Sequence, residues 1–295
     1  MNSISALAHF KQFSEQLQQV YDKDEARAIT DLIYREVLTL KATQLLVIDR
    51  ILSADEITFF DKILKRLLTG EPVQYVLGHT WFCGLKMEVN SSVLIPRPET
   101  EELTEQIIQY FHHNQIQQGI GIDFGTGSGC IPVAIKKNVP GIQMYGIDVS
   151  TDALKVATGN AFINKVNVDF MELDMLNEAQ TIAWLDTHQR EEMPCYWFSN
   201  PPYIAEQEQD QMHKNVLQFE PHLALFSKQD PLLFYRTLSN YLFKIKVLPK
   251  VVWLEINPLY ADETLALFAV HTNYSVQFMK DMQGKSRFLS AILNK

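Results

Sequence analysis

The chain has 295 residues, 46% of them hydrophobic and 21% charged, which is the composition of a globular protein and excludes a disordered or fibrous chain. Its 26 basic and 35 acidic residues give a net charge of −9, which disfavours a protein that binds mainly through nucleic-acid phosphates. Three widely spaced cysteines exclude a disulfide framework and favour a reducing compartment. No secretory signal and no apolar run of about 18 residues is present, so we expect a cytoplasmic protein.

The first 70 residues show apolar positions at helical spacing in three stretches, 7–20, 26–40 and 57–67. Ser53 and Glu56 have the spacing of a capping box, in which each side chain satisfies a backbone donor at the start of the third helix. Gly70 followed by Pro72 is typical of that helix's end. The pattern predicts a small helical bundle over residues 1–70.

Residues 73–95 change to short apolar runs that include Val73, Tyr75 and Leu77 and are punctuated by Gly78 and Gly84. Alternation and glycine turns of this kind indicate a β-hairpin. We therefore predict a hairpin linker over residues 71–98, followed by a larger domain over residues 99–295.

That larger domain alternates short β-rich runs with longer amphipathic ones, which predicts an α/β fold with helices on both faces of a mostly parallel sheet. The last two runs are separated by too few residues for a helical crossover, so they should pair antiparallel. The fold class predicted is Rossmann-like, with a seven-stranded sheet that ends in an antiparallel hairpin. The expected strands are 119–124, 142–147, 166–171, 195–199, 250–256, 274–279 and 287–293.

A glycine-rich loop, Gly125-Thr126-Gly127-Ser128-Gly129, follows the first strand and opens a helix. Glycines at such a junction allow the backbone to approach a ligand closely. Asp148 ends the next strand about twenty residues after Gly127, the interval at which an acid binds a ribose hydroxyl. These features predict a nucleoside-containing ligand, although a glycine turn that serves only helix packing is the alternative.

The spacing of the glycines is Gly-x-Gly-x-Gly, whereas pyrophosphate recognition favours Gly-x-Gly-x-x-Gly. Asp123, just before the loop, would repel a pyrophosphate but suits a cationic ligand. S-adenosylmethionine is therefore favoured over NAD. Asp174 and Met175 follow the third strand, where they either hold the adenine or serve as a solvated acid and a packing methionine.

Asn200-Pro201-Pro202-Tyr203 follows the fourth strand at the edge of the sheet where ligands bind in open α/β folds. Two prolines remove two N–H donors and leave a surface of acceptors, which suits a substrate with an NH₂ group. The Asn200 oxygen and the Pro201 carbonyl could each accept one N–H of a conjugated nitrogen, and Tyr203 could stack on its plane. The motif predicts methyl transfer to an amide or aromatic amine.

These motifs resemble those of the protein-(glutamine-N5) methyltransferases that modify class-1 peptide-chain release factors. Further matching blocks extend the resemblance over residues 65–290; they are Gly70 to Gly78, the Ile-Pro-Arg-Pro-Glu-Thr-Glu run at 95–101, Phe219-Glu220-Pro221, and Lys280-Asp281 with Gly284 and Arg287.

The resemblance implies a class I S-adenosylmethionine-dependent methyltransferase domain behind a substrate-docking helical bundle. It also implies methyl transfer to the glutamine side-chain amide of a Gly-Gly-Gln motif, with S-adenosylhomocysteine as product. By the same resemblance, residues 125–129 would contact the methionine part of the cofactor, Asp148 its ribose and Met175 its adenine. Asn200 would touch both the cofactor and the substrate, and Asn200 to Tyr203 would hold the glutamine.

Two other functions stay open at this stage. An adenine-N6 or other amino-methyltransferase on DNA or RNA would use Asn-Pro-Pro-Tyr in the same way, although the acidic charge makes direct nucleic-acid binding unfavourable. A non-catalytic module that keeps the cofactor pocket for stability is the third reading, which the intact Asn200 and Tyr203 disfavour. The histidines show no ligand spacing, so no metal is expected.

Overall fold

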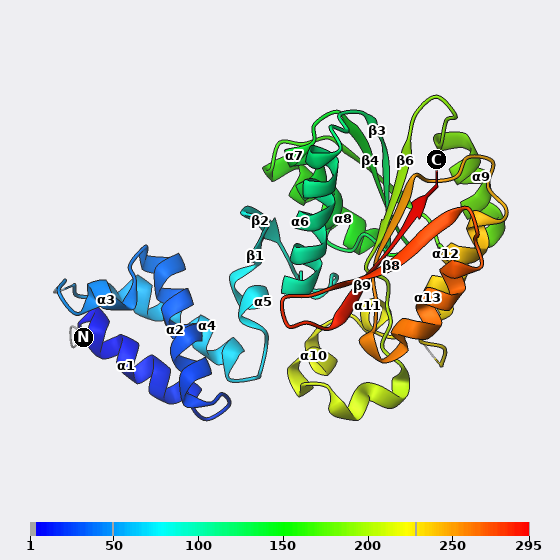
Figure 1. Cartoon of the computed structure of the whole chain (residues 1–295). Helices are drawn as coiled ribbons and strands as arrows, with labels where there is room; N and C mark the ends of the chain where they lie inside the picture. The colour runs from blue at the N-terminus through cyan, green and yellow to red at the C-terminus, as the bar shows by residue number, and fades with distance from the viewer. Residues whose placement is uncertain (1–3, 49, 228, 295) are drawn as a thin grey trace. The chain divides into compact units, whose positions relative to one another are not determined.

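The computed structural model describes residues 4–48, 50–227 and 229–294. The chain divides into two compact units, Met1–Gly78 and His79–Lys295 (Figure 1). The division falls inside the predicted linker 71–98. Among the described residues, no helix is long and apolar enough to cross a membrane.

The first unit is a helical bundle, as predicted, and its core is aromatic. Tyr34 stacks on Phe60 with ring centroids 4.5 Å apart, and Phe10 and Phe13 meet Tyr34 edge-on. The predicted capping box is confirmed at the start of α4, where Ser53 Oγ accepts from the backbone of Glu56 and the Glu56 carboxylate accepts from that of Ser53. The helices are α1 (Ala6–Leu17), α2 (Lys23–Leu38), α3 (Ala42–Leu45), α4 (Ala54–Leu67) and α5 (Val73–Leu77).

The prediction of strand from Val73 to Leu77 is wrong, because these residues form the short helix α5. The neighbouring Tyr75 and Val76 are both buried, which an alternating strand with one face in solvent does not provide. The Arg66 guanidinium donates to the carbonyl oxygens of Tyr75 and Val76, which satisfies two acceptors of this turn. Gly78, at φ 76°, ends it.

The second unit begins with a two-stranded antiparallel hairpin of β1 (His79–Phe82) and β2 (Leu85–Glu88), so only the middle of the predicted range 71–98 forms a hairpin. A seven-stranded sheet follows, in the order β5-β4-β3-β6-β7-β9-β8. The predicted antiparallel pairing of the last two strands is confirmed. The strands of the sheet are β3 (Gly119–Phe124), β4 (Ile142–Asp148), β5 (Val168–Glu172), β6 (Cys195–Ser199), β7 (Val251–Glu255), β8 (Tyr274–Lys280) and β9 (Ser286–Leu293).

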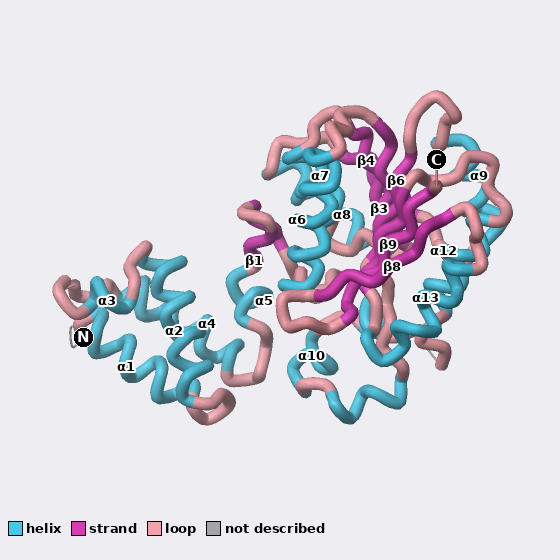
Figure 2. Tube along the Cα trace, in the orientation of Figure 1, coloured by secondary structure: helices cyan, strands magenta, loops and turns pink. Residues whose placement is uncertain are grey.

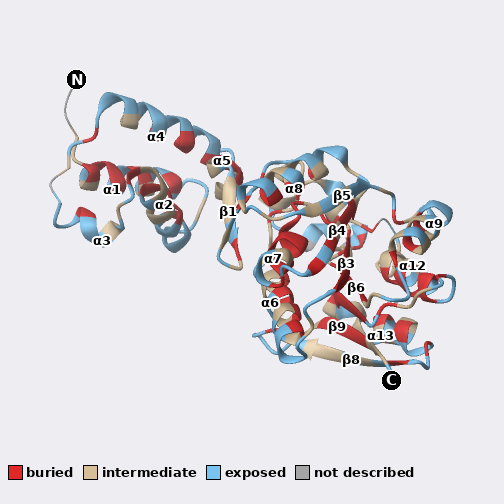
Figure 3. Cartoon of the chain, turned by 90° about the horizontal axis from the view of Figure 1, so that it is seen from above, coloured by how far each residue is buried: buried red, intermediate tan, exposed pale blue. Residues whose placement is uncertain are grey.

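Helices cover both faces of this sheet, and each face has its own apolar core. One core packs α6, α7 and α8 on the sheet, and the other packs α9, α12 and α13 (Figure 1). In Figure 3 the central strands are red because nearly all their residues are buried. The helices are α6 (Pro98–His113), α7 (Cys130–Asn138), α8 (Thr151–Ile163), α9 (Glu178–His188), η1 (Glu206–Gln211), α10 (Lys214–Phe219), α11 (His222–Leu225), α12 (Leu233–Leu242), η2 (Pro258–Tyr260) and α13 (Ala261–Ala269).

The strand order reverses between β3 and β6, the two central neighbours (Figure 2). From β3 the chain proceeds outward through β4 and β5, and it then returns to the other side of β3 with β6 and β7. Ligands of open α/β sheets bind at such a reversal, outside the carboxyl ends of the strands. Phe124 and Ser199, the last residues of β3 and β6, are register partners, so the predicted glycine loop and Asn200 corner begin side by side.

Candidate active site

Backbone hydrogen bonds attach the glycine loop to the end of β4. The N–H groups of Gly125 and Thr126 both donate to the Ile147 carbonyl at 2.9 Å, and that of Gly127 donates to Asp148 Oδ2 at 2.8 Å. A phosphate-binding glycine loop instead points such N–H groups at the ligand. The loop therefore fits a nucleoside ligand without a pyrophosphate at this turn.

The three glycines of the loop have positive φ angles, where other residues are strained, but they differ in their surroundings. A Cβ added at Gly125 or Gly127 would meet nothing within 4 Å, whereas one at Gly129 would come within 2.9 Å of Ala157 Cβ. The first two glycines thus border open space, and Gly129 allows α7 to pack against α8.

Asp148 lies at the end of β4 with its carboxylate anchored by two backbone donors. Oδ2 accepts from Gly127 N, and Oδ1 accepts from Ser150 N at 2.9 Å. Burial raises the pKa of Asp148, and these backbone hydrogen bonds oppose that change. A carboxylate has about four acceptor positions, so two remain for hydroxyl donors of a ligand.

Asp123 lies beneath the loop at 1% exposure. Its Oδ2 accepts from Thr126 Oγ1 at 2.6 Å, while Oδ1 has no hydrogen-bond partner among the described residues. Burial raises the pKa of Asp123 to about 8, and the hydrogen bond from Thr126 opposes the rise. With this pKa Asp123 is largely protonated at neutral pH, so its charge does not by itself exclude an anionic ligand, and a cationic ligand above the loop would favour its ionised form.

A cavity of about 270 Å³ opens above the loop. Asp148 and Asp174 line it, and of the described lining residues Arg97 carries the one positive charge. Met175 also lines it and is 6% exposed. All but one of the sequence-predicted cofactor residues line this cavity; they are Gly125, Thr126, Gly127, Ser128, Asp148, Asp174, Met175 and Asn200. Gly129, the last residue of the loop, is not a lining residue.

Residues of the Asn-Pro-Pro-Tyr corner line this cavity and a second one of about 210 Å³. Asn200 lines both, Pro202 lines the first, and Pro201 and Tyr203 line the second. The corner is tied to β3, because Ser199 Oγ donates to the Phe124 carbonyl at 2.7 Å. A group in one cavity can therefore meet a group in the other beside the Asn200 side chain.

Two buried residues outside the predicted site hold this corner. Asn200 Nδ2 donates to Thr100 Oγ1 at 2.9 Å, and Thr100 Oγ1 donates to Glu255 Oε2 at 2.7 Å. The Tyr203 hydroxyl donates to Glu255 Oε1 at 3.0 Å. Thr100 belongs to a block that carries the family resemblance, but nothing in the sequence links it to Glu255, which lies 155 residues away.

Burial shifts the pKa values of the ionisable side chains in this network. Burial raises the pKa of Glu255, while hydrogen bonds from Thr100 and Tyr203 and the charge of Arg287 oppose the rise. Burial and the neighbouring Glu255 raise the pKa of Tyr203 well above its ordinary value. Tyr203 is therefore neutral at physiological pH and acts as a hydrogen-bond donor.

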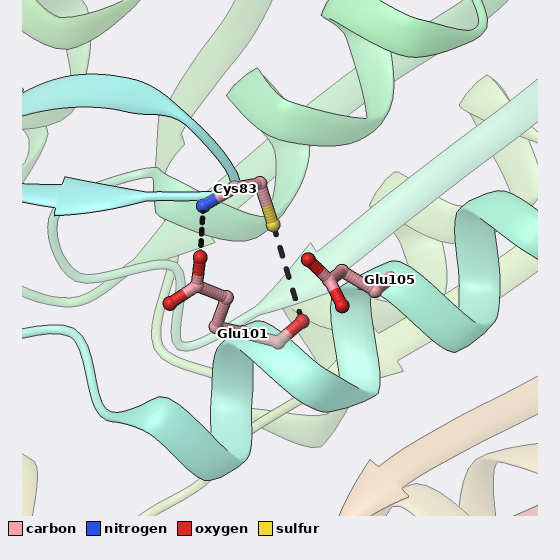
Figure 4. A group of neighbouring side chains, drawn as sticks. All are labelled: Cys83, Glu101 and Glu105. Carbon is pink, nitrogen blue, oxygen red and sulfur yellow. Dashed lines mark hydrogen bonds between the residues drawn. The ribbon is translucent and has the colours of Figure 1, made fainter.

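Cys83, Glu101 and Glu105 place potential metal-ligand atoms within 4.8 Å of one another (Figure 4). The Glu101 carboxylate already accepts from the Cys83 backbone at 2.6 Å. Burial raises the pKa of the Cys83 thiol well above its ordinary value, and the two carboxylates add to this, so the thiol is not a thiolate. The group serves to attach the β1–β2 turn to α6.

The residues of the first cavity fit S-adenosylmethionine. The open space at Gly125 and Gly127, the remaining acceptor positions of Asp148 and the two acidic lining residues Asp148 and Asp174 suit a cationic nucleoside. Arg97 also lines this cavity, and its guanidinium is ion-paired at 2.7 Å with Glu220, which is 4% exposed.

Two family models match the chain. Residues 9–78 match the PrmC N-terminal domain, and residues 99–219 match the methyltransferase small domain. The matched ranges include the helical bundle, the glycine loop, Asp148 and the Asn200 corner. The crystal structure of the hMettl16 catalytic domain in complex with MAT2A 3'UTR hairpin 6 has the same fold, with a TM-score of 0.54 at 13% identity over 83% of this chain and 84% of that one.

Curated relatives match over nearly the whole chain. The release factor glutamine methyltransferase of Flavobacterium psychrophilum is 36% identical over 94% of this chain and 95% of its own length. That of Bacteroides thetaiotaomicron is 34% identical over 99% of both chains, and that of Streptococcus pneumoniae is 30% identical over 95% of both. With this coverage and with both domains matched, the chain belongs to the family of release factor glutamine methyltransferases.

Proposed function

We propose that the protein transfers a methyl group from S-adenosylmethionine to the side-chain amide nitrogen, N5, of the glutamine in the Gly-Gly-Gln motif of class-1 peptide-chain release factors. The observation that carries this proposal is the place of Asn200, on the wall shared by the two cavities. Cavities that adjoin at one residue allow a methyl donor bound in the first to face an acceptor nitrogen bound in the second.

The first cavity is the cofactor site in this proposal. S-adenosylmethionine supplies an electrophilic methyl group on a sulfonium. Residues 125–128 border its methionine part, Asp148 accepts from the ribose hydroxyls, and Asp174 and Met175 border the adenine. Arg97 offers its guanidinium to the carboxylate.

The second cavity receives the glutamine side chain. Its amide nitrogen is a poor nucleophile, because its lone pair is delocalised into the carbonyl group. Asn200 Oδ1 and the Pro201 carbonyl oxygen accept its two N–H bonds and favour the positive charge that develops on it. Fixed orientation of two reactants recovers about 7–11 kcal/mol of barrier in favourable cases, so positioning is the main contribution of these residues.

The proton leaves the nitrogen after methyl transfer, when the methylated amide is strongly acidic, so the corner needs no dedicated base. Tyr203 lines the second cavity and its hydroxyl donates to Glu255, and in this proposal its ring packs on the planar amide. No metal has a role in this mechanism.

A release factor is favoured over a nucleic acid as the substrate for two reasons. The similar proteins over the full length are named release factor glutamine methyltransferases, and the net charge of −9 opposes phosphate binding. We also propose that the protein acts in the cytoplasm, because its proposed substrates act in translation.

The test is to incubate the full chain with radiolabelled S-adenosylmethionine and, in parallel, a purified class-1 release factor, its Gly-Gly-Gln variant with Gln→Ala, and duplex DNA. We expect label on the release factor, none on the Gln→Ala variant, and none on DNA. Label on DNA but not on the release factor would establish the nucleic-acid alternative. Cofactor binding with no label on any of the three would establish a non-catalytic module.

A further inference from the structure

A continuous chain of side-chain hydrogen bonds connects three separate elements behind the Asn200 corner. It runs from Asn200, after β6, through Thr100, in the first turn of α6, to Glu255, the last residue of β7. Thr100 is 3% exposed and Glu255 is 1% exposed. Buried polar groups of this kind are strongly constrained, because each unmade hydrogen bond leaves a desolvated group without a partner.

The direction of these hydrogen bonds follows from chemistry. Glu255 receives the hydroxyl protons of Thr100 and Tyr203 on its two oxygens, and these hydrogen bonds and the charge of Arg287 favour its ionised form, which can only accept. Thr100 has a single hydroxyl hydrogen, so once that hydrogen points to Glu255 the Thr100 oxygen can only accept from Asn200. The NH₂ end of the Asn200 amide therefore faces Thr100, and its oxygen is left for the cavities.

The orientation of Asn200 matters for the reaction. An amide group can rotate by 180° and exchange its oxygen and its NH₂ at little steric cost. When the Asn200 side-chain oxygen faces the substrate, it can accept a hydrogen bond from an N–H of the nitrogen that is to be methylated. When the Asn200 NH₂ faces the substrate instead, it meets the two N–H groups of that nitrogen, and no hydrogen bond forms because all of these groups are donors. Only the first arrangement assists methyl transfer.

We propose that Thr100 and Glu255 are positioning residues for methyl transfer, which hold Asn200 with its side-chain oxygen directed at the acceptor nitrogen. This inference rests on the proposed function and deepens it. Glu255 fixes the hydroxyl hydrogen of Thr100, and Thr100 in turn fixes the amide of Asn200. Glu255 also binds Tyr203, so a single carboxylate sets both polar residues of the corner.

The test compares Thr100→Val, which removes the hydroxyl group at nearly constant shape, with Thr104→Val as a matched control. Thr104 is a buried threonine one turn further along α6, and its hydroxyl donates to the Thr100 backbone rather than to the network. We expect T100V to lower kcat by about tenfold or more, as for loss of an oriented polar contact, with the KM for S-adenosylmethionine within about threefold. T104V should keep kcat within about threefold of wild type.

Two further variants separate positioning from a structural role. Thr100→Ser retains the hydroxyl and should restore kcat to within about threefold of wild type, and Thr100→Ala replaces T100V if that variant does not fold. In a double-mutant cycle, adding T100V to Asn200→Ala should lower kcat no further, because Thr100 acts through Asn200.

A wild-type kcat in T100V and T100A, or an equal loss from T100V in the N200A background, would overturn the inference. Failure of the proposed function is distinct from both outcomes, since the wild-type protein would then place no methyl group on the release factor.

Discussion

The two halves of the site, the glycine loop and the Asn200 corner, begin side by side on β3 and β6 but are held in different ways. The loop is shaped by its own backbone, which donates to Ile147 and Asp148 at the end of the adjacent strand. The corner is shaped by side chains, through Thr100 and Glu255 on two distant elements. The cofactor side thus depends on backbone conformation, and the acceptor side depends on the polarity of a buried network.

The largest effect is expected from the glycines of the loop. Gly129→Ala combines a left-handed conformation with a Cβ 2.9 Å from Ala157, so it should lower the free energy of unfolding by about 2–5 kcal/mol. Gly127→Ala has the strain without the clash and should cost about 1–2 kcal/mol, but its Cβ points into the space proposed for the cofactor. Denaturant unfolding and calorimetric titration with S-adenosylhomocysteine measure the two effects. Equal losses of stability in both variants would show that the packing of Gly129 has been misjudged.

Substitutions in the Asn200 corner should change the rate of catalysis more than the stability of the protein. Asn200→Ala removes one acceptor of the proposed amide site, so we expect turnover to fall by about 100-fold or more. Affinity for S-adenosylhomocysteine should stay within about tenfold, because the backbone-shaped loop is intact. Asn138→Ala, at an exposed asparagine at the end of α7, is the matched control. Wild-type turnover in the Asn200 variant would contradict the mechanism.

A smaller effect is expected on the pH dependence of stability, through Asp123 beneath the glycine loop. Because burial raises the pKa of Asp123 from 3.8 to about 8, the folded protein binds one more proton than the unfolded chain between these values. Stability contributed by this group is complete below the unfolded pKa and is lost as the pH rises through 8. Asp123→Asn should therefore gain stability relative to wild type, by about 2 kcal/mol more at pH 8 than at pH 6. A difference that is the same at both pH values would show that Asp123 is ionised throughout.

The sequence predicted most of what is local. The strands Gly119–Phe124 and Cys195–Ser199 follow from short β-rich runs, and their structural bounds are those expected. The glycine spacing and Asp148 could be identified because they lie on consecutive strands of one βαβ unit. The short helix α5 was missed because Val73, Tyr75 and Leu77 alternate like a strand, although Pro72 and Gly78 limit them to one helical turn.

The long-range part of the site could not be predicted from these patterns. Thr100 follows the prolines of a matched block and reads as an ordinary residue of a first helical turn. Glu255 ends a fully buried strand and carries no motif of its own. They meet because α6 packs on β7, which joins residues 155 positions apart, and no spacing within a single segment encodes that contact.

The central claim is that the Asn200 corner presents acceptors to a planar amide nitrogen beside the cofactor cavity. The most direct measurement is a crystal structure of the full chain with S-adenosylhomocysteine and a peptide that contains the Gly-Gly-Gln motif. We predict that the glutamine amide nitrogen occupies the second cavity, within about 3 Å of Asn200 Oδ1 and of the Pro201 carbonyl oxygen. A glutamine bound elsewhere, or an Asn200 whose NH₂ faces the substrate, would contradict the account.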